Sequence, residues 1–141
     1  MDAFRWGGAI TLEMDVKGVP TPQGSTKSFV RGGKPIITTD NKGLKAWRDL
    51  VAFTAQDADP EYVDNGPVRV SLFFRMPKPK AEPKTKRTWP DRRPDLDKLI
   101  RAILDALTGI AFRDDGQVVG IHAEEDWGEP GVRIEVERLT E

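Results

Sequence analysis

Five aspartates in the stretch RRPDLDKLIRAILDALTGIAFRDDGQV, residues 92–118, are the residues best suited to chemistry in this sequence. They stand at positions 95, 97, 105, 114 and 115, around an apolar run with helical spacing. Carboxylates packed close together repel one another unless a cation lies between them. Oxygen clusters of this kind are what Mg²⁺ or Mn²⁺ requires. The stretch therefore predicts a site for a hard divalent cation.

Each aspartate also has a purely structural explanation. Asp95 can cap the N-terminus of the helix, for about 1 kcal/mol. Asp97, Arg101 and Asp105 share one helical row at i, i+4 and i+8, where they can form exposed ion pairs worth a few tenths of a kcal/mol each. Residues 114–116, Asp-Asp-Gly, can be an ordinary turn. Taken motif by motif, both explanations stay open.

Other kinds of catalytic site fit the sequence poorly. The chain has no cysteine, which excludes disulfides and thiol catalysis, and its single histidine, His122, leaves no Ser–His pair to build a nucleophile from. A calcium-binding EF-hand loop beginning at Asp95 would need glycine where Ile100 stands. No G-x-x-x-x-G-K-[ST] loop occurs, so no nucleotide cofactor is expected.

The elements that must position the aspartates follow from apolar periodicity. The best helix spans 95–107, with an apolar stripe of Leu96, Leu99, Ile100, Ile103, Leu104 and Leu107 closed by Gly109. Alternation or apolar spacing predicts, in order, a strand over 9–16, a helix over 44–56, a strand over 67–76, that best helix, and two final strands over 117–127 and 131–139 joined by the turn GEPG. The order β-α-β-α-β-β predicts a two-layer α+β fold, with helices packed on one side of a small mixed or antiparallel sheet.

Two connecting segments are strongly basic. Residues 17–43 are rich in Gly, Pro, Ser and Thr and read as a long basic loop, and residues 77–94 read as a second one because their five prolines forbid regular structure. Acidic residues gather elsewhere, notably after residue 94. Charge segregated in this way favours a polyanionic partner, although either segment alone could be a solubilising loop.

Length and composition predict a single domain over residues 1–141. The N-terminal residues lack a basic start and a sustained apolar run, so no signal peptide is expected. No stretch approaches the roughly 20 apolar residues that a membrane span needs. We therefore expect a cytoplasmic protein that is not a membrane protein.

The segment DLDKLIRAILDALTGIAFRDDGQV resembles the signature of the RusA-like Holliday junction resolvases. That signature reads roughly D-L-D-N-x-x-K-x-x-x-D-A-L-x-G, then a short apolar hook, then D-D-x-Q-V. The match holds one spacing register over about 24 residues. Weaker similarity continues in PTPQGSTKSF, in the KAWRDLV helix and in the strand that leads into the basic proline-rich loop.

The resemblance implies that Asp95, Asp97 and Asp115 are the catalytic acidic residues of a metal site, with Asp114 adjacent as a further metal-site residue. It implies Mg²⁺ as the cofactor, with Mn²⁺ as an alternative. Arg101 falls where the family has a catalytic lysine, and it keeps the charge but not the point geometry of that residue.

A second departure is Lys98, which stands where the family has asparagine and adds a positive charge at the edge of the site. The implied activity is a metal-dependent, structure-specific endodeoxyribonuclease that resolves four-way DNA junctions by paired nicks in recombination and repair, working as a homodimer. Because of Lys98 and Arg101, one alternative is a branched-DNA-binding protein with weak or lost cleavage, and another is a general flap or branched-DNA nuclease. Proteins of this kind often come from phages or prophages.

The basic segments would then hold the DNA backbone while the aspartates hold the metal against one phosphate. The predicted DNA-binding residues are Lys27, Arg31, Lys34, Lys78, Lys80, Lys84, Lys86, Arg87, Arg92, Arg93 and Lys98. Trp89 interrupts the second basic segment. We expect it to anchor the loop to the core, with stacking on an unpaired base as the alternative.

Overall fold

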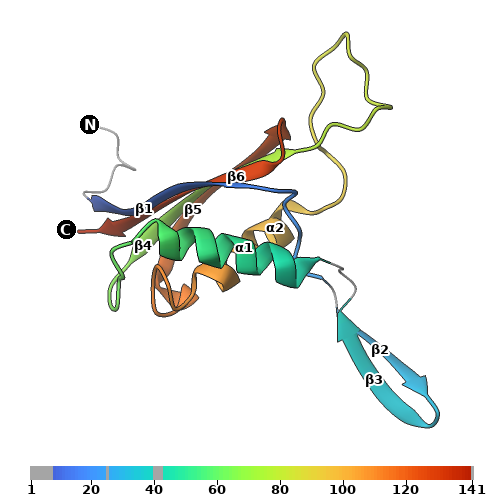
Figure 1. The fold of residues 1–141 in the computed structure, drawn as a ribbon, viewed down its shortest axis with the longest axis horizontal. Helices are drawn as coiled ribbons and strands as arrows, with labels where there is room; N and C mark the ends of the chain where they lie inside the picture. The colour runs from blue at the N-terminus through green and yellow to red at the C-terminus, as the bar shows by residue number, and fades with distance from the viewer. Residues whose placement is uncertain (1–7, 25, 40–42, 141) are drawn as a thin grey trace.

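A mixed β-sheet with two helices packed on one of its faces forms the body of the protein (Figure 1). The computed structural model describes residues 8–24, 26–39 and 43–140. Its elements are β1 (Gly8–Lys17), β2 (Thr26–Arg31), β3 (Lys34–Thr39), α1 (Leu44–Asp57), β4 (Val68–Met76), α2 (Leu96–Leu107), the single-turn 3₁₀ helix η1 (Asp115–Gln117), β5 (Val118–Trp127) and β6 (Gly131–Leu139).

The main sheet has the strand order β1-β6-β4-β5. Strands β4 and β5 are parallel, and the other neighbours are antiparallel. In β4 the side chains alternate, so that Val70, Leu72 and Phe74 are buried beneath the helices while Phe73 faces the opposite, open side. Apart from an additional hairpin, the elements follow the predicted order β-α-β-α-β-β, and the predicted α+β class is confirmed.

Helix α2 supplies the crossover that a parallel β4–β5 pair requires. Its predicted apolar stripe is confirmed, since Leu99, Ile103 and Leu107 are fully buried and the other three members pack against the core at its margin. Phe112, in the hook that follows the helix, is also fully buried. Because the crossover connects two parallel strands, α2 runs antiparallel both to β4, which precedes it in the chain, and to β5, which follows it.

The prediction of an unbroken loop over 17–43 is wrong, because β2 and β3 form an antiparallel hairpin within it. Gly32 and Gly33 form its two-residue turn with positive φ angles of 59° and 75°, the conformation that twists a tight hairpin correctly. The many small and polar residues around this pair obscured the two short strands. The hairpin projects away from the body (Figure 1).

The two final strands, which a short turn would normally join into a hairpin, do not pair with each other. Strand β4 lies between β5 and β6, so the GEPG segment steps over the end of β4, where the Gly128 N–H donates to the Met76 carbonyl at 3.0 Å. Two strand spacings amount to about 10 Å, which the three linking residues can span. Strand β5 is therefore an edge strand rather than half of a hairpin.

Candidate active site

Asp95 and Asp97 lie at the start of α2, and the side chain of the N-cap residue Asp95 does not cap the helix. Asp95 occupies the N-cap position, where its carbonyl accepts from the backbone N–H groups of Lys98 (3.1 Å) and Leu99 (3.2 Å). Its side chain makes no capping hydrogen bond. Asp97 is exposed in the first turn. The capping explanation of Asp95 therefore fails, and its carboxylate is left for another partner.

The row of charges along α2 does not form the ion-pair ladder that its spacing allows. Among the residues that the structure describes, no ion pair joins Arg101 to Asp97 or to Asp105. Arg101 is exposed and Asp105 is half-buried. The guanidinium of Arg101 thus remains one turn beyond Asp97, and it makes no ion pair with either neighbouring aspartate of its row.

The turn over 113–117 separates the roles of two adjacent aspartates. Asp114 Oδ1 accepts from the Gly116 N–H at 2.8 Å, and the Gln117 Oε1 accepts in return from the Asp114 N–H at 2.9 Å. This capping box gives Asp114 the structural role that the turn explanation assigns to it. Asp115 is exposed at the start of η1 and has no such bond.

Gln117 is a residue to which the motif alone assigns no role. Its Oε1 also accepts from the Arg113 N–H at 3.0 Å, and its Nε2 donates to the carbonyls of Val63 (3.1 Å) and Gly66 (3.0 Å). One amide therefore uses two acceptor and two donor positions to fix the turn against the segment before β4. The position of Asp115 depends on this clamp.

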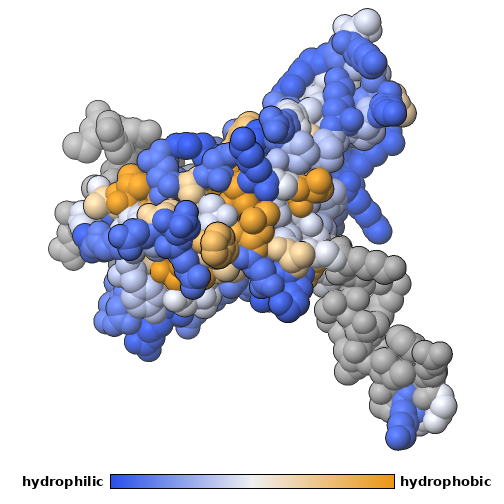
Figure 2. All heavy atoms as spheres, viewed as in Figure 1, coloured by the Kyte–Doolittle hydropathy of each residue, from blue (hydrophilic) through white to orange (hydrophobic). Residues whose placement is uncertain are grey.

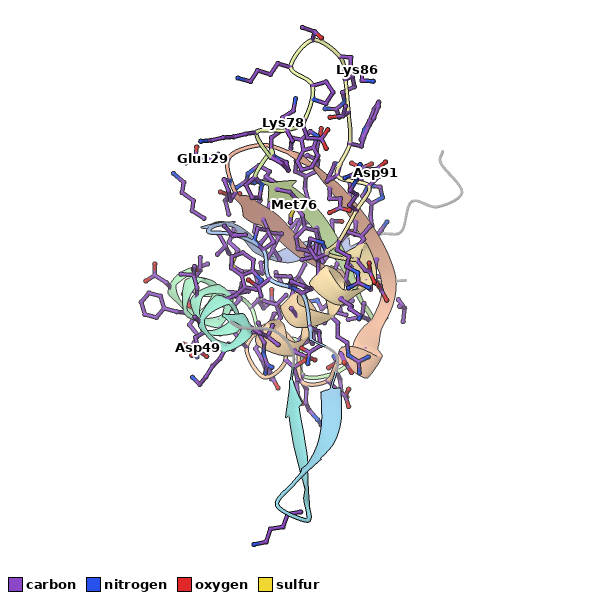
Figure 3. All side chains as sticks on the ribbon, turned by 90° about the vertical axis from the view of Figure 1, so that its right-hand side faces the viewer. Asp49, Met76, Lys78, Lys86, Asp91 and Glu129 are labelled. Carbon is purple, nitrogen blue, oxygen red and sulfur yellow. The ribbon has the colours of Figure 1, made fainter. Side chains whose placement is uncertain are left out.

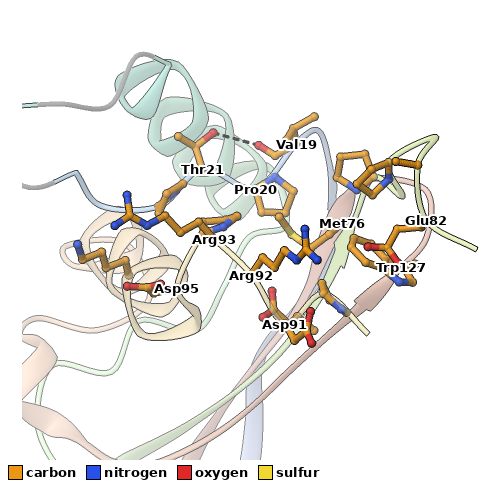
Figure 4. Close-up of a pocket in the computed structure, with 18 of the residues that line it drawn as sticks. Val19, Pro20, Thr21, Met76, Glu82, Asp91, Arg92, Arg93, Asp95 and Trp127 are labelled. Carbon is orange, nitrogen blue, oxygen red and sulfur yellow. Dashed lines mark hydrogen bonds between the residues drawn. The ribbon is translucent and has the colours of Figure 1, made fainter. Parts of the chain in front are cut away.

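A groove of about 1090 Å³ lies beside the start of α2. It is bordered by residues 19–24, by the end of β4, by residues 90–95 and by the end of β5, and Asp95 and Lys98 both line it. Figure 4 shows Arg92 and Arg93 on the segment that leads to Asp95. Lys98 is half-buried there and has a bonding partner of its own.

Two buried oxygens on the wall of this groove, Gln23 Oε1 and Glu125 Oε2, have no hydrogen-bond partner among the described residues. Burial raises the pKa of the Glu125 carboxyl above its usual value, because the charged form loses solvation. Neither residue stands in a motif, and their burial follows only from how distant segments pack. The groove therefore offers acceptors for a cation or for N–H donors.

The predicted cluster of Asp95, Asp97 and Asp115 is not assembled within one chain. Helix α2 has 12 residues and a length of about 18 Å, and it separates the first two aspartates from the third. Strand β5 begins next to η1 and ends at the groove, about 30 Å away. Within residues 8–24, 26–39 and 43–140, no three His, Asp or Glu side chains gather closely enough to hold a metal ion.

The basic residues lie on two projections, of which the loop over 77–94 borders the groove. Figure 1 shows the loop over 77–94 and the β2–β3 hairpin extending from the same end of the molecule in different directions. Figure 2 shows that this loop is largely hydrophilic, and Figure 3 shows Lys78 and Lys86 along it and Asp91 at its base. The exposed members of the predicted set are Lys34, Lys78, Lys80, Lys84, Lys86, Arg87, Arg92 and Arg93. The side chains of Lys27 and Arg31 lie outside the described part.

Arg87 differs from the other basic residues of the loop because it is paired with Asp126 at 2.6 Å. Trp89 does not anchor the loop to the core as expected, since 57% of its surface is exposed. The buried residue of this segment is Pro90. In the described part of the chain, no helix is long and apolar enough to cross a membrane.

Comparison with known proteins agrees with the resemblance noted in the sequence. The family model described as Endodeoxyribonuclease RusA matches residues 17–137. The chain is also 27% identical over 139 residues to the uncharacterized protein YqaN of Bacillus subtilis (strain 168), an alignment that covers 92% of this chain and 97% of that protein.

Proposed function

The chain belongs to the RusA endodeoxyribonuclease family, and from this premise we propose that it resolves four-way DNA junctions by metal-dependent paired nicks. The observation that carries the proposal is the unused pair of carboxylates at the start of α2. An aspartate at the N-cap normally accepts a hydrogen bond from a free backbone N–H of the helix, yet the Asp95 side chain makes no such bond and lines a groove with Arg92, Arg93 and Lys98. The proposal includes bacterial or prophage DNA in the cytoplasm as the setting.

The donor atoms present fit a hard divalent cation. Asp95 and Asp97 offer carboxylate oxygens at the start of α2, and in the groove that Asp95 lines, Gln23 and Glu125 each have a buried oxygen with no partner among the described residues. The chain has no cysteine and one histidine, so a site for a softer metal has few ligands to draw on. We propose Mg²⁺, with Mn²⁺ as an alternative, held by Asp95, Asp97 and Asp115, with Asp114 beside them.

A symmetric homodimer is part of the proposal, because one chain leaves Asp115 at the far end of α2. A two-fold axis that reverses α2 exchanges its two ends, so that Asp115 of a second copy comes beside Asp95 and Asp97 of the first. Such an axis generates two equivalent sites. Resolution of a four-way junction needs paired cuts on opposite strands, which two sites related by a two-fold axis can make.

Each group has a distinct role in phosphodiester hydrolysis. A water oxygen attacks phosphorus, the bond to the 3′-oxygen breaks, and the leaving oxygen takes a proton, so the products are a 5′-phosphate and a 3′-hydroxyl. When bound, the cation neutralises phosphoryl charge and activates the water. Arg101, exposed one turn beyond Asp97, contacts a phosphate, and the lysines of the loop over 77–94 hold the backbone on either side.

One observation favours a second candidate, a branched-DNA-binding protein with weak or lost cleavage. Lys98 lines the same groove as Asp95 and carries a positively charged ammonium group. A positive charge near a carboxylate competes with a cation for it. In that case the groove would bind DNA without cutting it efficiently.

The test is incubation of a synthetic four-way junction with the protein in Mg²⁺ and in chelator, beside flap and linear duplex controls. We expect symmetric nicks on opposite strands of the junction in Mg²⁺ alone. Tight junction binding with no nicks in Mg²⁺ or Mn²⁺ would favour the binding protein. Faster cutting of the flap than of the junction would indicate a general branched-DNA nuclease.

A further inference from the structure

The side chain of Trp89 is exposed, so packing of its ring in the core does not fix its position. The neighbouring residues fix the loop instead, since Trp127 Nε1 donates to Thr88 Oγ1 at 3.0 Å and Pro90 is buried. The Asp91 N–H donates to the Trp89 carbonyl at 2.8 Å. The backbone on both sides of the ring is therefore held while the indole itself stays accessible.

A paired arginine lies against one face of this ring. The Arg87 Cζ is 4.4 Å from the Trp89 ring centroid, and the same guanidinium donates to Asp126 Oδ2 at 2.6 Å. Asp126 Oδ1 in turn accepts from the Trp127 N–H at 2.7 Å, so the arginine is connected to the end of β5. The hydrogen bond from Arg87, followed by that from the Trp127 N–H, lowers the pKa of Asp126 below its usual value.

This arrangement distinguishes Trp89 from the other exposed aromatic residues. Phe53 on α1 is 67% exposed, Tyr62 is 45% exposed and Phe73 on β4 is 38% exposed. In the described residues, none of these three rings has a cation stacked on it. A ring that is fixed, exposed and backed by a guanidinium is well suited to stack on a flat ligand, because stacking then costs little conformational entropy.

The surroundings indicate that the ligand is a nucleic acid base. Lys84 and Lys86 precede Trp89, and Arg92 and Arg93 follow it, and all four side chains are exposed. Trp89 is six residues before Asp95, a separation of at most about 22 Å. That distance corresponds to about six base steps of a DNA strand, so a base on Trp89 lies close to any phosphate held at Asp95.

We propose that Trp89 stacks on an unpaired base at the branch point of the DNA, with Arg87 supporting the opposite face of the ring. The inference rests on the proposed function, and it adds to it a means of selecting branched over linear DNA. Paired bases inside a duplex present no free face, whereas a base displaced at a branch does. Stacking would also set how far the branch point lies from the nick.

The experiment measures binding in chelator, so that cleavage plays no part. The substrates are a four-way junction with 2-aminopurine at the branch, the same junction with 2-aminopurine in an arm, and a linear duplex. The variants are Trp89→Leu, Trp89→Phe and, as a control on an equally exposed aromatic, Phe53→Leu. The wild-type protein should quench the branch probe and leave the arm probe unchanged.

Trp89→Leu should lose the quenching and bind the junction about 10-fold or more weakly, while its duplex binding stays unchanged. Trp89→Phe should lose less, and Phe53→Leu should match the wild type.

An unchanged junction preference in Trp89→Leu would overturn the inference and leave the proposed function standing. A wild-type protein that binds junction and duplex equally would overturn both. Dissociation of a dimer by Trp89→Leu, seen by light scattering, would show that a second copy covers the ring.

Discussion

The carboxylates on the open face of the sheet and those near the groove are treated in opposite ways. On the open face Asp15 pairs with Arg75 at 2.8 Å, and Glu13 pairs with Arg133. At the groove, the Asp95 side chain makes no capping hydrogen bond, and Glu125 Oε2 is buried with no partner in the described part of the chain. These two acids of the open face are thus paired with arginine. Asp95 and Asp97 have no ion pair to arginine among the described residues, so their carboxylate oxygens can take a cation.

The largest effect is expected when a carboxylate is replaced by an amide, first at the candidate site and then, as a control, on the open face. Asp95→Asn, Asp97→Asn and Asp115→Asn should each lower the nicking rate at least about 100-fold, because each removes a ligand of the metal. Junction binding in chelator should persist, since it depends on the basic loop. Gel assays of cleavage and of binding measure the two effects separately.

The matched control is Asp15→Asn on the open face, which should cut at the wild-type rate because its carboxylate only pairs with Arg75. Wild-type activity in two of the three site variants would contradict the assignment of the metal ligands.

A second prediction concerns how the turn holds Asp115. Gln117→Glu removes both donors to the carbonyls of Val63 and Gly66 and should lower the free energy of unfolding by about 2 kcal/mol. Cleavage should fall while junction binding is kept. Denaturant titration measures the free energy of unfolding. The control is Gln56→Glu, at an exposed position of α1. Equal stability of Gln117→Glu and wild type would mean that the clamp does not fix the turn.

A third prediction separates free from paired lysines. Lys84→Gln with Lys86→Gln should flatten the dependence of log affinity on log salt by about 0.9 for each lost duplex phosphate contact. Lys45→Gln, which removes a lysine paired with Asp49 on α1 at 2.7 Å, should leave the slope unchanged. Filter binding at several salt concentrations gives the slopes. Identical slopes in all three proteins would make the loop a solubilising arm.

The smallest effect is expected at Glu125, where burial raises the pKa of the carboxyl. Because the folded protein disfavours the charged form, this carboxyl costs no stability below its unfolded pKa and lowers stability as pH rises through its folded pKa. Glu125→Gln should therefore be more stable than wild type at pH 7, by less than about 1 kcal/mol because solvent reaches part of the side chain, and equal to it near pH 3. Thermal melts across pH measure this difference, with Glu135→Gln on the open face as the control because no ion pair joins Glu135 to another described residue. Lower stability of Glu125→Gln than of the wild type at pH 7 would contradict the prediction.

The elements that depend on local pattern could be predicted, and those that depend on distant pairing could not. The apolar stripe of α2 and the β-branched run of β4 specify their structures locally. The insertion of β6 beside β4 is set by pairing between residues more than 60 apart, such as Val70 and Val136. The β2–β3 hairpin was missed because the glycine pair at its turn resembles any flexible loop.

The candidate site shows the same division. The spacing of Asp95 and Asp97 on a helix start was readable from the sequence. Asp114 and Asp115 are identical residue types in adjacent positions, and only the bond to Gly116 distinguishes the structural one from the free one. That Glu125 and Gln23 belong to the candidate site could not be predicted from the sequence, because both are buried only where the end of β5 meets the segment over 19–24.

The most direct test of a metal site shared between two copies is to mix two inactive variants, Asp97→Asn and Asp115→Asn. In a mixed dimer one shared site carries both substitutions and the other carries neither. Equal mixing makes half of the dimers mixed, so about a quarter of the wild-type nicking should return. Each nicking event should cut only one strand of the junction. If each chain builds its own site, every site in the mixture keeps one substitution, and the mixture will stay as inactive as either variant alone.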